Sequence, residues 1–399
     1  MLLPQRFTYP SPGFSHYWNV GKGEIKLKQL ANIPSEKEIR KSAESLWDSD
    51  ILADEVIKDV YEKLGYQKAS KLIDEILENG IDTVNDIPES VKQLFIELDN
   101  CPEWLNEELL EIGSGFCRRS GALGLIVLRN YCLMGGYESA AINKPLIFTG
   151  ALKKGSVKRI ADTNDFWMNT TGEKSLTRFG VGFKSAVKTR LTHAFVRVML
   201  QKSPTWKNEL WGIPLNQADM LATNLGFSLV FMEGLKDLGF APTAKEIHGI
   251  FHLWKYIGFL LGIPASSLPD SEEQAIEALY NWTISQPAAD EDTKQLAHSL
   301  MQLPSMASLP FLWQRKILIK INLGFNHYFL GKRTCDVMGL PNTMMKLLPY
   351  GIKIFRKFKE QIILSNKTLY LRSQIKGRNS QEIIRRRFLL SIEKLPERV

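Results

Sequence analysis

The chain has 399 residues, of which 44% are hydrophobic and 24% are charged, which is the composition of a globular protein. These fractions exclude a collagen, a coiled coil and a disordered chain. The net charge of +8 is concentrated at the C-terminal end, because residues 346–399 hold 14 Lys and Arg against 4 Asp and Glu. The rest of the chain is slightly acidic. This argues against a nucleic-acid-binding body and leaves the tail as a candidate contact segment.

Cysteine usage and the N-terminus bear on the compartment. The four cysteines form no CxxC pair, which excludes a disulfide framework and favours a reducing environment. The first 14 residues are rich in proline and aromatic residues and lack the apolar run of a secretory signal. The longest uncharged run, Gln295–Gln314, contains two prolines and would be a poor membrane span. We therefore expect a cytoplasmic protein, with peripheral contact at the inner membrane surface as a further possibility.

The predicted elements are helices from Ser35 onward. Residues 1–34 are interrupted by proline and glycine and should be irregular. Ser35 and Glu38 form a capping box, and the apolar spacing that follows predicts short, charged helices up to residue 100. A buried helix is expected at 119–133, and others at 176–202, 216–239, 243–262, 271–285, 290–302 and 311–330.

Strand patterns are nearly absent, so the predicted class is mainly α. We expect a single large helical domain with extensions at both ends. Residues 1–100 form the N-terminal extension, residues 101–345 the main domain, and residues 346–399 a basic tail.

The histidines offer two candidate sites. His248 and His252 share a helical face at a spacing that can bind metal, but the glutamate of an HExxH site is missing, so a packed or half-exposed pair is favoured. His193 lies in KSAVKTRLTHAFVRVML, where small and aliphatic neighbours leave room for a flat ring. Arg190 and Arg197 stand about one turn to either side and could bind carboxylates. A haem needs such an imidazole, apolar wall and cations; a satisfied core histidine is the alternative.

A second cluster lies upstream in one predicted helix. Arg159, Asp162 and Thr163 have the spacing i, i+3, i+4 and therefore share a face. An arginine and a threonine that converge in a pocket can donate hydrogen bonds to dioxygen. The alternative is the start of a surface helix, in which Arg159 simply contacts Asp162 or Thr163.

Several ordered motifs resemble those of the latex-clearing-protein (rubber oxygenase) and MpaB-type oxygenase family. They are TGALKKGSVKRIADTNDFW, KTRLTHAFVR, WGIPLNQADMLATNLGFSLVFMEGLKDLGF and HLWKYIGFLLGIP, and the resemblance spans residues 105–345. It implies a mainly helical, globin-like core that binds haem b. The family's R-x-x-x-T element falls on Arg159 to Thr163, its haem-ligating histidine on His193, and a pocket threonine on Thr223.

The resemblance implies a haem b-dependent oxygenase that uses dioxygen on an apolar, unsaturated terpenoid or lipid-like substrate, with oxidative C=C cleavage as a candidate reaction. His193 would ligate the iron, its other ring nitrogen bonded to a carbonyl or carboxylate. Asp162 would relay protons or pair with Arg159. A haem carrier or sensor without turnover and a helical interaction module that has lost its cofactor are the alternatives.

One position departs from the family pattern. Rubber-cleaving members carry a lysine immediately before the threonine, where this chain has Asp162. The exchange replaces an ammonium donor with a carboxylate. We therefore expect a smaller, intracellular substrate rather than polyisoprene.

The tail contains an amphipathic basic segment, GIKIFRKFKEQIIL. Ile352, Phe355, Phe358, Ile362 and Ile363 recur at helical spacing, whereas the cations occupy other positions. In one interpretation the apolar face packs on the main domain and the charges are solvated. In the other, the segment binds an anionic membrane surface weakly and in a salt-sensitive manner.

Overall fold

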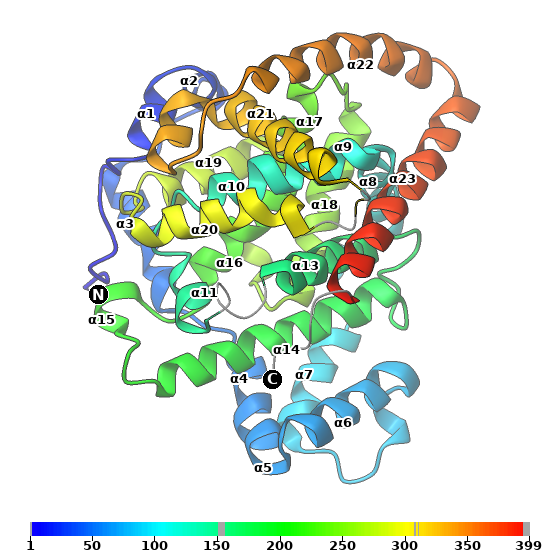
Figure 1. Ribbon diagram of the computed structural model, residues 1–399. Coiled ribbons are helices and arrows are strands. Elements are labelled where there is room, and N and C mark those ends of the chain that lie inside the picture. The colour runs from blue at the N-terminus through cyan, green and yellow to red at the C-terminus, as the bar shows by residue number, and fades with distance from the viewer. Residues whose placement is uncertain (1, 151–155, 307–308, 310, 394–399) are drawn as a thin grey trace.

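The computed structural model describes residues 2–150, 156–306, 309 and 311–393, and within these residues the protein is helical and has no strand (Figure 1). The predicted mainly α class is therefore confirmed. The α-helices are α1 Ser15–Asn19, α2 Lys22–Leu27, α3 Glu36–Ser42, α4 Ile51–Val56, α5 Glu62–Leu64, α6 Tyr66–Asn79, α7 Glu89–Asp99, α8 Glu107–Arg119, α9 Gly121–Val127, α10 Met134–Gly136, α11 Lys144–Phe148, α13 Ser156–Thr170, α14 Val181–Lys202, α15 Asn208–Trp211, α16 Gln217–Leu225, α17 Phe231–Asp237, α18 Ala244–Leu260, α19 Glu272–Thr283, α20 Glu291–Gln302, α21 Leu312–Val337, α22 Leu348–Leu364 and α23 Lys367–Glu393.

Local sequence signals set several helix boundaries. The capping box predicted at Ser35 is present: the Glu38 amide donates to Ser35 Oγ, and the Ser35 amide donates to Glu38 Oε2. A second capping box, formed by Thr243 and Glu246, starts α18. The helix predicted at 311–330 continues to Val337, but Gly331 inside it has a φ of 78° and kinks it.

Two predicted helices contain a π-helical stretch that the sequence pattern did not reveal. Leu128–Leu133 joins α9 to α10, and Gly226–Val230 joins α16 to α17. A π-helical turn inserts an extra residue and rotates the side chains beyond it, and such turns occur frequently at functional sites. A third stretch, Ile57–Tyr61, lies in the N-terminal part.

Close helix packing supports the middle of the molecule. α8 and α18 cross where Gly113 faces Gly249, and a Cβ on Gly113 would lie only 2.2 Å from the Gly249 carbonyl oxygen. The absence of both side chains therefore permits this approach. In Figure 1, α9, α16 and α18 lie in the middle, α14 runs beneath them, and α22 crosses the top.

A connected hydrophobic core includes residues from the N-terminal part as well as from the main domain. Trp18, Ile39 and Phe95 belong to the same buried cluster as Phe116 and Trp254. The first hundred residues thus pack directly onto the body. The predicted divisions at residues 100 and 345 stay predictions.

Helix α22 of the tail docks on the body through Arg356, Glu360 and Ile363, while much of its apolar face stays exposed. Glu360 of α22 is buried with Arg119 of α8, whereas Phe355 and Phe358 are 69% and 66% exposed. Of the predicted apolar residues, Ile363 is buried and Ile352 half-buried, while Ile362 is exposed. The interpretation that the apolar face packs on the main domain therefore holds for Ile363 and, in part, for Ile352, but not for Phe355, Phe358 and Ile362.

None of the helices described here is both long and apolar enough to cross a bilayer.

Candidate active site

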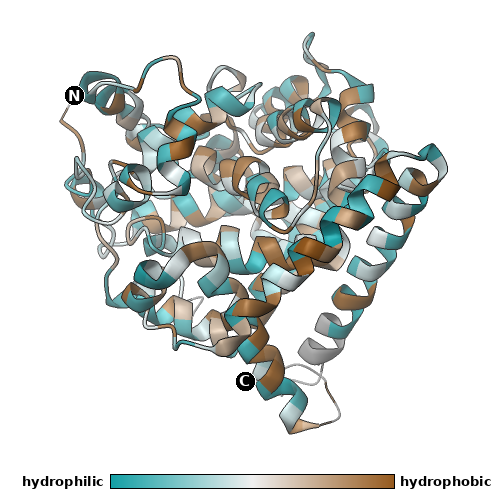
Figure 2. Ribbon diagram, turned by 90° about the horizontal axis from the view of Figure 1, so that it is seen from above, coloured by the Kyte–Doolittle hydropathy of each residue, from teal (hydrophilic) through white to brown (hydrophobic). Residues whose placement is uncertain are grey.

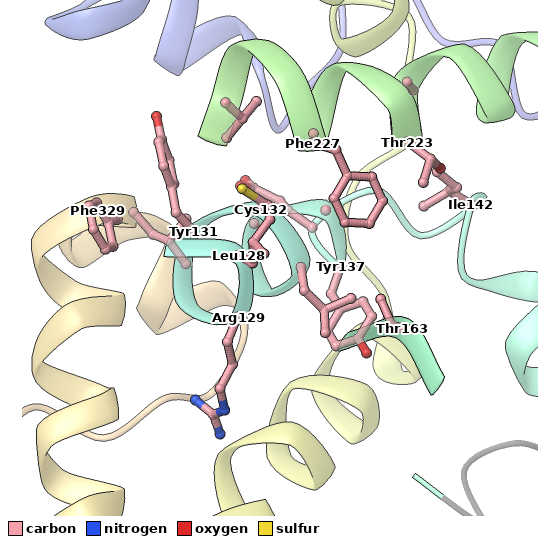
Figure 3. A pocket seen from close by; sticks show the side chains of 18 of the residues that line it. Leu128, Arg129, Tyr131, Cys132, Tyr137, Ile142, Thr163, Thr223, Phe227 and Phe329 are labelled. Carbon is pink, nitrogen blue, oxygen red and sulfur yellow. The ribbon is translucent and has the colours of Figure 1, made fainter. Parts of the chain in front are cut away.

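A cavity of about 1290 Å³ lies inside the helical body, and its walls are mostly apolar. It is bordered by side chains from α13, α14, α16, α21, α23 and both π-helical stretches of the main domain. Figure 3 shows one part of its lining, where Phe227 and Thr223 project from one helix and Tyr137 and Thr163 lie beside each other. The size and polarity suit a large apolar ligand.

The π-helical stretches contribute directly to this lining. Leu128, Tyr131 and Cys132 come from the first stretch and Phe227 from the second, and all four line the cavity (Figure 3). Phe227 stacks on Trp254 of α18 with the ring centroids 4.8 Å apart. The irregular turns thus hold part of the cavity wall in place.

His193 borders the cavity from the middle of α14. It is half-buried, and its Nδ1 atom is buried without a hydrogen-bond partner among the described residues. Burial, reinforced by the positive charge of Arg197, lowers the pKa of His193 to about 4. The ring is therefore neutral at physiological pH, as a metal ligand requires. The hydrogen bond expected from the ring to a carbonyl or carboxylate is not formed at Nδ1.

Arg159 and Thr163 of α13 also line the cavity. The Arg159 guanidinium donates to the Tyr137 hydroxyl at 2.5 Å, and Thr163 Oγ1 donates to the Arg159 carbonyl at 2.9 Å. Arg159 is half-buried, so the interpretation as a plain surface helix start does not hold for it. Arg159 thus supplies N–H donors at a mostly apolar wall, whereas the single hydroxyl proton of Thr163 is used in its bond to the Arg159 carbonyl.

Asp162 lies beside them but does not pair with Arg159. It lines the cavity and is otherwise exposed, and the ion pairs among the described residues do not include one between Asp162 and Arg159. Burial of part of the carboxyl group raises the pKa of Asp162, against the nearby charge of Lys158. The predicted ion pair is therefore wrong for this structure, while the proton-relay alternative stays a prediction.

Arg190 and Arg197 do not line the cavity, although both flank His193 on α14. Arg190 donates to Asp50 at 2.6 and 2.8 Å and to Glu97 at 2.7 Å. Arg197 donates to Asp54 at 2.7 Å and to the Leu215 carbonyl at 2.9 Å. The structure corrects the expectation that they bind haem propionates, because both are committed to contacts outside the cavity.

Thr223 lines the cavity, as its assignment to a pocket threonine requires, and its hydroxyl donates to the Asp219 carbonyl at 2.9 Å. His252, in contrast, is packed: its Nε2 accepts from the Asn106 amide at 2.9 Å, and His248 is exposed. The interpretation of these two histidines as a packed or half-exposed pair is confirmed. The described residues contain no cluster of three or more metal-ligating side chains.

Sequence reasoning missed two ionisable groups of the cavity wall, Arg129 and Glu138. Burial lowers the pKa of Arg129 to about 10, and the guanidinium donates to two neutral acceptors, Asn130 Oδ1 at 2.7 Å and the Leu300 carbonyl at 2.5 Å. Burial raises the pKa of Glu138, against a hydrogen bond from Thr334. Arg129 could have been found from the sequence, because it is an isolated arginine within the apolar run LGLIVLRNYCLM. Glu138 lies in a loop of small residues, and no sequence pattern marks it as part of the cavity.

Fold and site together define a helical protein whose large apolar cavity is bordered by a neutral histidine and by arginine and threonine donors. A family of such proteins matches the sequence: the model described as "ER-bound oxygenase mpaB/B'/Rubber oxygenase, catalytic domain" covers residues 118–358. Because the match spans more than half of the chain, the chain belongs to this oxygenase family. The predicted resemblance is confirmed.

Two relatives agree with this assignment. The rubber oxygenase of Streptomyces sp. (strain K30) is 23% identical over 330 residues, which are 80% of this chain and 77% of the relative. The solved structure of the latex clearing protein LCP in its closed state superimposes with a TM-score of 0.66 at 20% identity, covering 84% of this chain and 91% of LCP. At that identity the structural likeness shows the shared fold.

Proposed function

We propose that this protein is a haem b-dependent oxygenase that uses dioxygen on an apolar, unsaturated substrate of terpenoid or lipid type, with oxidative cleavage of a C=C bond as the candidate reaction. Membership of an oxygenase family supports the reaction class. The observation that supports the cofactor is the environment of His193. Its imidazole is neutral and borders the cavity, and its Nδ1 is buried without a hydrogen-bond partner among the described residues. Buried polar atoms are rarely left unpaired, which supports a bound group at this position.

The cavity residues fit a haem. His193 supplies the ligand, Phe227 and Trp254 supply part of an apolar wall, and the cations of Arg129 and Arg159 border the same cavity. We propose Arg129, in place of Arg190 and Arg197, as a partner of the propionates or of another anionic group in the cavity. When bound, the haem supplies the binding and activation of dioxygen.

The protein's own side chains orient the reactants and handle protons. Tyr137 holds the Arg159 guanidinium, so that its remaining N–H groups can donate to dioxygen, with Thr163 beside it. Asp162 and Glu138 both have raised pKa values, which make their carboxyl groups better proton carriers near neutral pH. We propose Asp162, at the open side of the wall, as the proton relay.

The polarity and size of the proposed substrate are inferred from the apolar walls of the cavity and from the presence of Asp162. Apolar walls select a ligand with little polarity, as the name of the relative, rubber oxygenase, also suggests. With Asp162 in place of the lysine of rubber-cleaving members, a compound smaller than polyisoprene fits better. All four cysteines are free thiols, which supports the proposed cytoplasmic location.

Absorption spectroscopy after expression with haem supply tests the proposal. We expect a Soret band, and oxygen consumption that depends on an added unsaturated terpenoid or lipid. Protein that folds but shows no Soret band would contradict the haem assignment. A Soret band without an oxygen-dependent product would favour the second candidate, a haem carrier or sensor, which the same His193 geometry also supports.

A further inference from the structure

Helix α22 turns an apolar stripe toward solvent. Ile354, Phe355, Phe358 and Ile362, here called the α22 stripe, are 62%, 69%, 66% and 61% exposed. At 100° per residue these four side chains fall on one side of the helix, with Lys357 and Lys359 at its two margins. In Figure 1 this helix crosses the top of the molecule, and in Figure 2, seen from above, hydrophobic and hydrophilic residues alternate along it.

A buried ion network holds α22 in this orientation. Arg119 of α8 is 2.7 Å from Glu360 and 2.6 Å from Glu246, and Arg356 pairs with Glu360 from the same helix. Tyr370 of α23 donates to Glu246 at 3.0 Å. Rotating α22 to bury its stripe would expose this network and leave Arg119 without one of its carboxylates, at a large cost in free energy. The outward position of the stripe is therefore built into the fold.

The exposed charges of α22 and of the first part of α23 have one sign. Glu360 is the only acidic residue between residues 346 and 381, and it is 1% exposed. Every exposed charged side chain of this stretch is therefore a lysine or an arginine, including Lys367, Arg372 and Lys376. Leu371 and Ile375 of α23, 50% and 64% exposed, add apolar area beside these cations.

We propose that the α22 stripe and its basic margins bind the surface of an anionic lipid bilayer. Exposed aromatic and aliphatic side chains can enter the boundary between headgroups and acyl chains, while lysines at the margins meet the anionic headgroups. A second copy of the chain is a poorer occupant, because a two-fold interface would oppose the same lysines to one another without an exposed acid to pair them. The inference is independent of haem and of turnover.

Co-sedimentation with vesicles tests the inference on the full chain. Vesicles of equal parts phosphatidylcholine and phosphatidylglycerol should bind the protein at low salt, and phosphatidylcholine alone should bind it much less. Binding should weaken at about 1 M salt, where the screening length falls to ~3 Å. The double change Phe355→Ser with Phe358→Ser should reduce the partition coefficient by roughly tenfold or more. Lys357→Gln should reduce it by about fivefold on anionic vesicles only.

The chain offers a matched control. Ile362 in the stripe and Ile96 on α7 are both 61% exposed, so Ile362→Ser and Ile96→Ser remove the same side chain at the same exposure. Only the first should weaken vesicle binding, and circular dichroism should show both variants folded. Equal binding by the two variants, no binding by the parent protein, or a parent dimer that the Phe355 and Phe358 changes convert to a monomer would each overturn the inference.

Discussion

Two neighbouring positions of α14 bury ionisable side chains in opposite ways. Arg190 is buried and forms hydrogen bonds with both Asp50 and Glu97. His193, three residues further on, borders the cavity with its Nδ1 unpaired. A buried group that the protein itself satisfies stabilises the fold, whereas one left unsatisfied is retained for a ligand or for chemistry.

The same contrast recurs between the ion network under α22 and the cavity wall. Arg119 donates to two carboxylates and is fully buried, while Arg129 donates to the neutral acceptors Asn130 Oδ1 and the Leu300 carbonyl. The fold alone explains the buried positive charge of Arg119, because Arg119 pairs with Glu246 and Glu360. The positive charge of Arg129 makes this residue a candidate partner for an anionic group of the bound ligand.

The largest effect is expected at His193, the position of α14 whose ring nitrogen has no partner among the described residues. His193→Ala should abolish tight haem binding, because it removes the imidazole proposed as the iron ligand. Haem content per protein and the Soret band measure this, with His248→Ala, an exposed histidine, as the control. A full haem complement with an unchanged spectrum in the His193 variant would place the ligand elsewhere.

A change at Arg190, which has partners within the protein, should instead lower the stability of the fold. Arg190→Met leaves Asp50 buried without its main partner and should cost about 3–5 kcal/mol in the free energy of unfolding. Lys188→Met on the same helix breaks an ion pair with Asp74 whose side chains are both 50% exposed, and should cost less than about 1 kcal/mol. Urea unfolding of the two variants measures the difference; equal losses would contradict the comparison.

Arg159→Ala probes the donors of the cavity wall. A charge-assisted hydrogen bond is worth about 1.5–3 kcal/mol, so if it forms only in the transition state the rate should fall by roughly 10- to 150-fold. Haem content should stay near that of the parent. Lys92→Ala, an exposed cation on α7 that does not line the cavity, should leave the rate unchanged. Parent-like kcat/KM in the Arg159 variant would remove it from the proposed machinery.

The smallest effect concerns Glu138 and depends on pH. Its folded-state pKa lies above the ordinary value of 4.5, so the stability that its protonated form contributes is present below that value and lost as the pH rises through the folded-state pKa. Glu138→Gln, neutral at every pH, should therefore gain stability relative to the parent at pH about 8 and lose that advantage near pH about 4. Tm measured across this range tests the sign; a gain that grows on acidification would reverse it.

Much of the fold could be predicted because its signals are local. Apolar spacing located most helices of the main domain, although not α8, and the Ser35–Glu38 pair located the start of α3. The motif containing Arg159 and Thr163 and the motif containing His193 are far apart in the chain, yet their side chains line one cavity, as the resemblance implied. The roles of Arg190 and Arg197 could not be predicted, because their partners Asp50 and Asp54 lie about 140 residues upstream.

By itself the sequence determined the helical class, the family and the side chains that mark the cavity, because periodicity, capping and motif order are properties of neighbouring residues. Only the tertiary structure decided which buried charges form ion pairs within the protein and which border the cavity. It also decided that α22 docks through Glu360 and exposes Phe355 and Phe358. An amphipathic pattern shows that a helix has two faces, but the inward face depends on partners such as Arg119, which the chain supplies from far away in the sequence.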